Sequence, residues 1–177
     1  EIAIDRKARS LAEQTVAAQE KDIRQAVDLA ERRLQEAHDL MKKKVNEPLR
    51  HEDALTEVAR KALSEVRKHT ATAEAVLRET SERVRNTAFD RLSDDFSDVA
   101  EEHVAPARKA AELAQLSDRR KEREASARLS ERKLEDALAA VDRLKRELDE
   151  SADRARYLAD LAALGVTVDE VVETRLF

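Results

Sequence analysis

The sequence predicts an all-α protein: an elongated antiparallel bundle of three long, coiled-coil-like helices with a short C-terminal capping helix. The 177 residues include one glycine and two prolines, whereas 41% are charged and 2% are aromatic. Turns commonly depend on glycine and proline, so a chain this poor in both must turn rarely. Its apolar residues, many of them alanine, must therefore form long and narrow stripes along helices.

The clearest stripe lies between Leu129 and Gly165. Apolar residues recur there at alternating three- and four-residue steps, interrupted only at Lys145. They are Leu134, Leu138, Val141, Leu148, Ala152, Ala155, Ala159 and Ala162. A second track of Leu144, Leu158, Leu161 and Leu164 makes the stripe wider than the seam of a two-stranded coiled coil. The wider face indicates more than one neighbouring helix.

The first predicted helix covers residues 3–46. Its apolar residues keep helical spacing from Ile4 to Met41, with one slip between Leu11 and Val16. The break after it falls at Asn46-Glu47-Pro48, because proline costs about 3 kcal/mol inside a helix but is tolerated in a first turn.

The second break lies between Ser93 and Pro106. Residues 93–97 are rich in side chains that compete with helical hydrogen bonds, whereas Ala105-Pro106 can open a new helix. We place the break at Pro106, which gives helices over 48–103 and 106–164. The three helices are then near-equal in length, roughly 70 to 90 Å at 1.5 Å per residue.

A polar stretch near the start of the third helix leaves one alternative open. Residues 117–128 carry no large apolar side chain. We expect them to form a solvated or kinked helix, with a break at Ser117 as the alternative. A parallel dimer kinked at Pro48 and Pro106 would bury nearly the same stripes, since periodicity does not name the neighbour of a buried face.

The C-terminal signals are sharper. Gly165 is the expected left-handed C-cap of the third helix. Thr167 with Glu170 forms a capping-box pattern that predicts a short final helix over 168–176.

Composition argues against an enzyme, so we expect no catalytic, cofactor or metal site. One glycine cannot form a glycine-rich phosphate loop, and the absence of cysteine excludes thiolate chemistry and disulfides. None of the four histidines has a glutamate three residues before it, as the di-iron pattern requires. These histidines, which we expect to be solvated or partly packed, are His38, His51, His69 and His103.

Three clusters are candidate contact surfaces. A basic contact patch would combine Lys42, Lys43, Lys44, Arg119, Arg120, Lys121 and Arg123, although a solvated face is the favoured interpretation. An apolar partner patch would consist of Phe89, Leu92 and Phe96, for which a core plug near a helix end is favoured. An acidic cluster consists of Asp94, Asp95, Asp98, Glu101 and Glu102; it could be an electrostatic counterpart within the bundle or across a dimer, although a solvated face is again the favoured interpretation.

The favoured function is a non-enzymatic helical interaction module, serving as a scaffold, spacer or regulatory arm within a larger protein. We expect a single elongated domain over 1–177 and a protein partner or self-association as a homodimer. The net charge of -5 and the short basic runs argue against nucleic acid. The alternatives are a crescent-like dimer that binds a membrane surface or polyanion, and a coiled-coil arm or insert of a motor ATPase.

The composition and the lack of long apolar runs indicate where the protein is located and the kind of organism it comes from. No apolar run approaches the roughly 20 residues of a membrane span, and no signal peptide is visible. We therefore expect a cytoplasmic protein, and the abundance of Ala, Asp and Arg favours a bacterial source.

Overall fold

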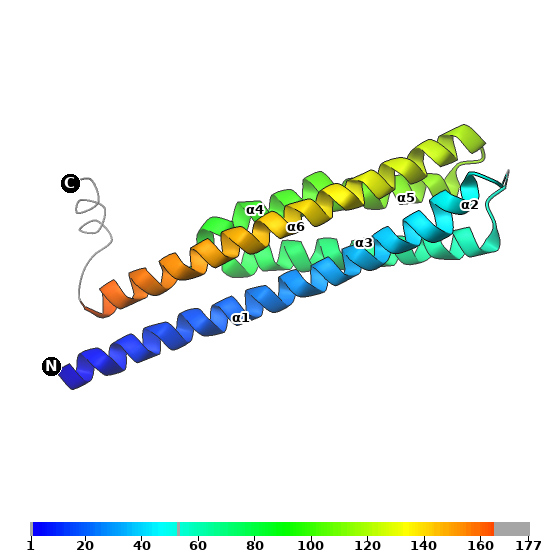
Figure 1. Ribbon diagram of the computed structural model, residues 1–177. Helices are drawn as coiled ribbons and strands as arrows, with labels where there is room; N and C mark the ends of the chain where they lie inside the picture. The colour runs from blue at the N-terminus through cyan, green and yellow to red at the C-terminus, as the bar shows by residue number, and fades with distance from the viewer. Residues whose placement is uncertain (1, 53, 165–177) are drawn as a thin grey trace.

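The described residues form an elongated antiparallel helical bundle (Figure 1). The structure is a computed structural model, and it describes residues 2–52 and 54–164. The predicted all-α bundle is confirmed. The part of the chain described here contains four helical segments side by side, where the sequence predicted three.

The first segment consists of α1 (Ile2–Leu40), the π-helix η1 (Met41–Asn46) and the single turn α2 (Glu47–Leu49). The chain then turns and enters α3 (Glu57–Val84), so a turn lies close to the predicted break. Pro48, however, ends the first segment and does not open the second. Thr56 provides the N-cap of α3, because its hydroxyl accepts a hydrogen bond from the Ala59 amide at 3.1 Å.

The third segment runs without interruption through the 3₁₀ turn η2 (Asp90–Leu92), α4 (Ser93–Val99), the π-helix η3 (Ala100–Val104) and α5 (Ala105–Leu116). The predicted break at Pro106 is therefore wrong.

Both prolines follow a π-helix, which explains how helices continue through them. A proline has no amide hydrogen, and its ring collides with the carbonyl four residues back in an α-helix. In η1 the Glu47 amide donates to the Lys42 carbonyl, and at the end of η3 the Ala105 amide donates to the Ala100 carbonyl. These bonds reach five residues back, so the turn before each proline is wider and accommodates the ring.

The turn that the sequence did not predict lies at residues 85–89, inside the predicted helix 48–103. Asn86 has φ 61°, in the left-handed region that asparagine tolerates better than most residues. The Asp90 carboxylate accepts a hydrogen bond from the Asn86 amide at 3.0 Å, and the Thr87 hydroxyl donates to the Val84 carbonyl. Local side-chain bonds thus close this turn, and apolar periodicity does not reveal them.

The alternative break at Ser117 is the one found. Ser117 has an extended backbone, with φ -76° and ψ 129°, and α6 begins three residues later (Arg120–Ala163). The predicted helix over 106–164 is therefore two helices, α5 and α6. Gly165, Thr167 and Glu170, with the predicted helix over 168–176, lie outside the described residues.

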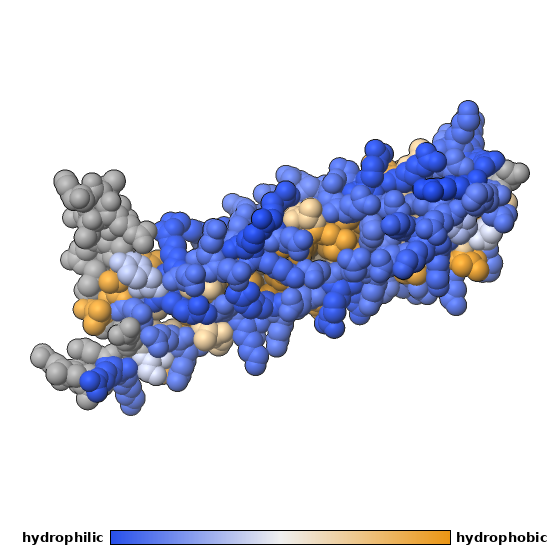
Figure 2. Space-filling model, in the orientation of Figure 1, coloured by the Kyte–Doolittle hydropathy of each residue, from blue (hydrophilic) through white to orange (hydrophobic). Residues whose placement is uncertain are grey.

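A continuous core runs along the axis of the four segments. Its largest fully buried side chains include Phe89, Phe96, Leu34, Leu63, Leu77 and Leu134. Many other core positions are alanine, which lets the helices approach closely. The outer surface is mostly hydrophilic on the face that Figure 2 shows. None of the described helices has a stretch long and apolar enough to cross a bilayer.

Candidate interaction site

Two helices continue beyond the four-helix part of the rod. Figure 1 shows α1 and α6 extending past the corner where α3 turns into η2 and α4. The end of α3 lies level with Gln19, since Val84 and Gln19 line the same hollow. We call the extension the arm and define it as residues 2–18 of α1 with residues 157–164 at the end of α6.

An ion-pair network fixes the two helices at the base of the arm. The largely buried Glu20 carboxylate accepts hydrogen bonds from Arg24 at 3.0 and 2.8 Å and also pairs with Arg156 of α6. Arg24 donates in turn to Asp149 at 2.6 Å. Its hydrogen bonds with Asp149 and Glu20 raise the pKa of Arg24. The register between α1 and α6 is therefore set where the arm begins.

The arm exposes an apolar face of α6 that is covered lower in the rod. Leu158 and Leu161 lie two heptads after Leu144 and Glu147, so they occupy equivalent helical positions. Leu144 is buried and Glu147 half-buried, in a groove shared with α4 and η3. In the arm these two elements have ended, and α6 runs beside α1 alone among the described helices (Figure 1). Leu158 and Leu161 are half-buried there. Leu164, farther along, is 63% exposed.

The arm exposes a matching face of α1. Ala12 lies one heptad before Gln19, whose side chain faces the end of α3. Ala8 is exposed, Ala12 is half-buried, and the adjacent Leu11 is 57% exposed. Among the described residues, the arm therefore lacks the two helices that complete the bundle elsewhere.

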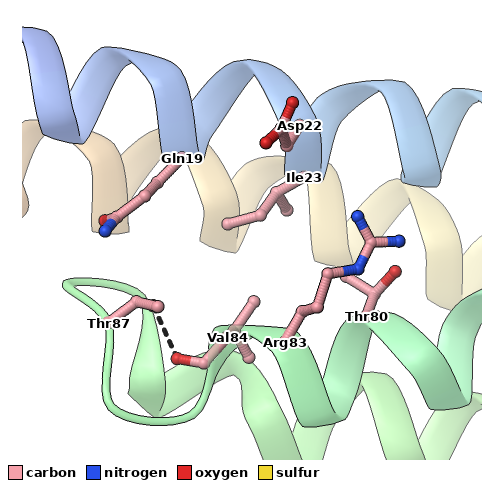
Figure 3. A pocket seen from close by; sticks show the side chains of 7 residues that line it. All are labelled: Gln19, Asp22, Ile23, Thr80, Arg83, Val84 and Thr87. Atoms are coloured by element: carbon pink, nitrogen blue, oxygen red, sulfur yellow. Dashed lines mark hydrogen bonds between the residues drawn. The ribbon is translucent and has the colours of Figure 1, made fainter.

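The boundary between rod and arm holds a small hollow of about 80 Å³ (Figure 3). The side chains of Gln19 and Ile23 extend toward it from α1, opposite the end of α3 and Thr87, whereas the Asp22 carboxylate at its rim points away. The buried Gln19 Oε1 atom has no hydrogen-bond partner among the described protein atoms. A hollow of this size suits a few water molecules, not a metabolite.

The acidic cluster lies on α4 and η3, beside the base of the arm. Asp95, Asp98 and Glu102 line a groove of about 140 Å³ opposite Glu147 and Arg143 of α6. Desolvation first, and then the neighbouring Asp95 carboxyl, raise the pKa of Glu147 to about 6. Three members of the acidic cluster thus face Glu147, another acid, inside the bundle. Of the remaining members, Glu101 pairs with Arg78 of α3 at 3.1 Å, and Asp94 is exposed.

The described residues contain no group of three or more His, Cys, Asp or Glu side chains that could hold a metal ion. Two histidines instead join neighbouring helices. His38 lies 3.2 Å from Glu135, and His69 lies 3.3 Å from Glu36. His51 is exposed and His103 half-buried.

The two halves of the predicted basic patch lie at the opposite end of the rod from the arm. Lys42, Lys43 and Lys44 are exposed on η1, and the Asn46 side chain in η1 donates to the Ala127 carbonyl of α6 at 3.1 Å. This bond places η1 within two turns of the start of α6, where the second basic run lies.

The positive charge of the second basic run is largely offset by glutamates that lie three or four residues farther along the chain. Arg119 lies 3.7 Å from Glu122, and Arg120 donates to Glu124 at 2.9 Å. Arg123 is only 8% exposed, whereas Lys121 is exposed. The structure therefore brings the two runs to one end without forming a continuous basic surface from all seven residues.

Phe89, Leu92 and Phe96 pack in the core under the corner between α3 and α4. Their side chains are not available to a partner. The arm exposes Leu164, and the rod exposes Val58, Leu113 and Leu116. Leu158 and Leu161, which belong with Leu164 to the second leucine track of the sequence, are half-buried. That track gave the signal, but the sequence did not show that the neighbouring helices would end before it.

No protein-family model, curated protein or solved structure matches this chain.

Proposed function

We propose that this protein is a protein-interaction module, in which a rigid four-helix rod presents the two-helix arm to a partner. One observation carries the proposal. Leu158 and Leu161 continue the face of α6 that packs against α4 and η3 elsewhere, yet in the arm α1 is the one described helix beside α6 (Figure 1). Contiguous apolar surface of this kind marks a site of association.

The chemistry of the arm favours a helical protein partner. Its two helices form half of a four-helix bundle, and an amphipathic helix or helix pair would complete it by placing leucines and alanines against the same faces. Such a partner would bury Leu11 and Leu164, which are now 57% and 63% exposed.

The rod supports a role as spacer, scaffold or regulatory arm. The 44 residues of α6 span about 66 Å, so the arm is held far from the end that carries Lys42–Lys44. We do not propose membrane or polyanion binding, because Arg119 and Arg120 pair with their own glutamates and Arg123 is buried.

Site-specific photo-crosslinking in cells tests the proposal. A benzoylphenylalanine at Leu161 should give one or a few discrete protein adducts, because this face would be occupied. The matched control places the same photo-crosslinker at Glu150, an exposed position of α6 within the rod. The absence of an adduct at Leu161, or the same adducts from both positions, would overturn the proposal.

A further inference from the structure

We infer that a proton shared by Asp95 and Glu147 holds α4 and η3 against α6, and that loss of this proton lets them separate more often. We call α4 and η3 together the cover segment, residues 93–104. Its separation from α6 would regulate the surface that the protein offers to a partner, a consequence that rests on the proposed function. The proton-dependent contact itself can be tested without a partner.

The contact between Asp95 and Glu147 requires a proton. Both side chains are half-buried in the groove between the cover segment and α6, and a side-chain hydrogen bond joins them. An ionised carboxylate only accepts hydrogen bonds, so this bond forms only when one of the two carboxyls keeps its hydrogen. The buried Glu147 Oε2 atom meets no amide, hydroxyl or basic donor in the described part of the chain. When both carboxyls ionise, the contact therefore becomes repulsive.

The groove around this carboxyl pair holds more acidic than basic side chains. From the cover segment it is also lined by Asp98, Glu102 and His103, and from α6 by Arg143. Glu150, farther along α6, adds a negative charge, and Arg143 opposes it. Asp98, Glu102 and Arg143 are exposed, so solvent screens their charges more than those of the half-buried pair. A proton therefore changes the contact most at the pair itself.

The cover segment has different contacts on its other side. Ser81 of α3 donates to the Ser93 carbonyl at 2.6 Å, and Arg78 of α3 pairs with Glu101 at 3.1 Å. Neither contact joins two acids, whereas the side that faces α6 presents acids to an acid. The cover segment should therefore separate from α6 while it stays attached to α3.

The pH range of the effect follows from the groove. Burial first, and then the hydrogen bond to Asp95, raise the pKa of Glu147 to about 6. When the cover segment separates, water reaches Glu147 and its pKa returns toward the ordinary value of 4.5. The closed contact thus binds the proton more tightly than the separated one. Separation should become more frequent as pH rises from about 4.5 to about 6, and the effect should persist above that range.

Separation would uncover apolar surface of the rod. Leu144 of α6 and Val99 of α4 line the same groove and are 2% and 6% exposed. Leu144 lies two heptads before Leu158, so the two leucines occupy equivalent helical positions. An open cover segment would therefore extend the apolar face of the arm into the rod.

The reaction rate of a single thiol measures the separation. The chain has no cysteine, so Val99→Cys places one thiol in the closed groove. Dithiodipyridine reacts with thiols at acidic as well as neutral pH, and its rate here reports how often the thiol becomes accessible. Adding Glu147→Gln should slow this reaction at pH 7.5, because the amide donates to Asp95 without a shared proton. At pH 4 the reaction should have the same rate with either residue at position 147.

The size of the effect follows from the pKa shift. A shift from 4.5 to about 6 corresponds to a rate ratio of about 30. Because both carboxyls are still in contact with solvent, screening reduces the expected ratio at pH 7.5 to about five. Comparing the variants at one pH cancels the pH dependence of the thiol itself.

Three controls isolate the shared proton. Asp95→Asn should slow the reaction as Glu147→Gln does, because an amide then donates in place of the proton. Asp136→Asn, at an exposed position of α6, should leave the rate unchanged. Val66 of α3 is fully buried, so the thiol of Val66→Cys reacts through global unfolding and should be slower than that of Val99→Cys.

Four outcomes would overturn the proton-dependent contact. They are equal rates for Glu147 and glutamine at pH 7.5, a difference that persists at pH 4, an Asp95→Asn variant that reacts like the wild type, and a Val99→Cys thiol no faster than that of Val66→Cys. Photo-crosslinking at Leu161 tests the proposed function separately. Adducts at Leu161 with unchanged thiol rates would reject only the proton-dependent contact, whereas the expected thiol rates without adducts would reject only its role toward a partner.

Discussion

Replacing Glu147 by glutamine should stabilise the protein at neutral pH. Glu147 faces Asp95, Asp98 and Glu102 across the groove between α4, η3 and α6, with Arg143 and His103 also lining the groove. Burial first, and then the Asp95 carboxyl, raise its pKa from 4.5 to about 6. Glutamine keeps the size of the side chain and removes the charge that this groove disfavours.

The magnitude follows from the pKa shift. At 1.36 kcal/mol per pKa unit, a shift from 4.5 to about 6 corresponds to about 2 kcal/mol. Because Glu147 is still in contact with solvent, screening reduces the expected effect to about 1 kcal/mol.

The sign follows from proton linkage. The folded state binds this proton more tightly than the unfolded state, since its pKa is raised. Ionising Glu147 therefore costs stability as pH rises from about 4.5 to about 6, and the full cost persists above that range. The glutamine variant should exceed the wild type by about 1 kcal/mol at pH 7.5, and the gain should vanish as pH falls to 4.

Urea unfolding followed by circular dichroism at both pH values measures this difference. At pH 7.5 the midpoint of thermal unfolding should also rise by about 2 to 4 °C. Asp136→Asn is the control, because Asp136 is an exposed acid on the same helix that does not contribute to the pKa shift of Glu147. A glutamine variant at position 147 that is no more stable than the wild type at pH 7.5 would refute the reasoning.

Three further substitutions test the core, the arm and the unpredicted turn. Phe96→Ala should lower the free energy of unfolding by about 3 to 5 kcal/mol in urea titrations, because Phe96 is fully buried, whereas Leu113→Ala should change it by less than about 0.5 kcal/mol. Glu20→Ala removes the buried carboxylate at the base of the arm, so hydrogen exchange should become faster in residues 2–18 while exchange in α3 stays unchanged. Asn86→Val should cost about 1 to 2 kcal/mol in thermal unfolding, since a β-branched residue disfavours φ 61°, whereas Asn86→Gly should be nearly neutral.

The arm and the acidic groove differ in how far the sequence pointed to them. Leu158 and Leu161 belong to a stripe that the sequence shows to be wider than a two-helix seam, so a further neighbour could be inferred. The pairing of Glu147 with Asp95 could not be inferred, because these residues meet only after α4 has packed against α6. The charges of two residues this far apart in sequence do not predict whether the residues are in contact.

The prolines show the limit of local rules. Pro48 lies near a real turn, but Pro106 lies within a continuous helix because the preceding π-helix η3 supplies room for its ring. The actual turn at residues 85–89 depends on hydrogen bonds among a few polar side chains, and it leaves the heptad spacing of Phe89 and Phe96 undisturbed. The apolar periodicity of the sequence therefore shows no break at the place where the chain reverses direction.

Composition and periodicity by themselves determined an all-α rod with a core of leucine and alanine, since few turns and long apolar stripes leave no other way to bury apolar surface. The tertiary structure alone decided that residues 2–164, apart from residue 53, form four segments and that α1 and α6 extend beyond the other two. The physical reason is that a stripe records which face of a helix is buried, whereas the neighbour, and the point where that neighbour ends, depend on contacts between distant parts of the chain.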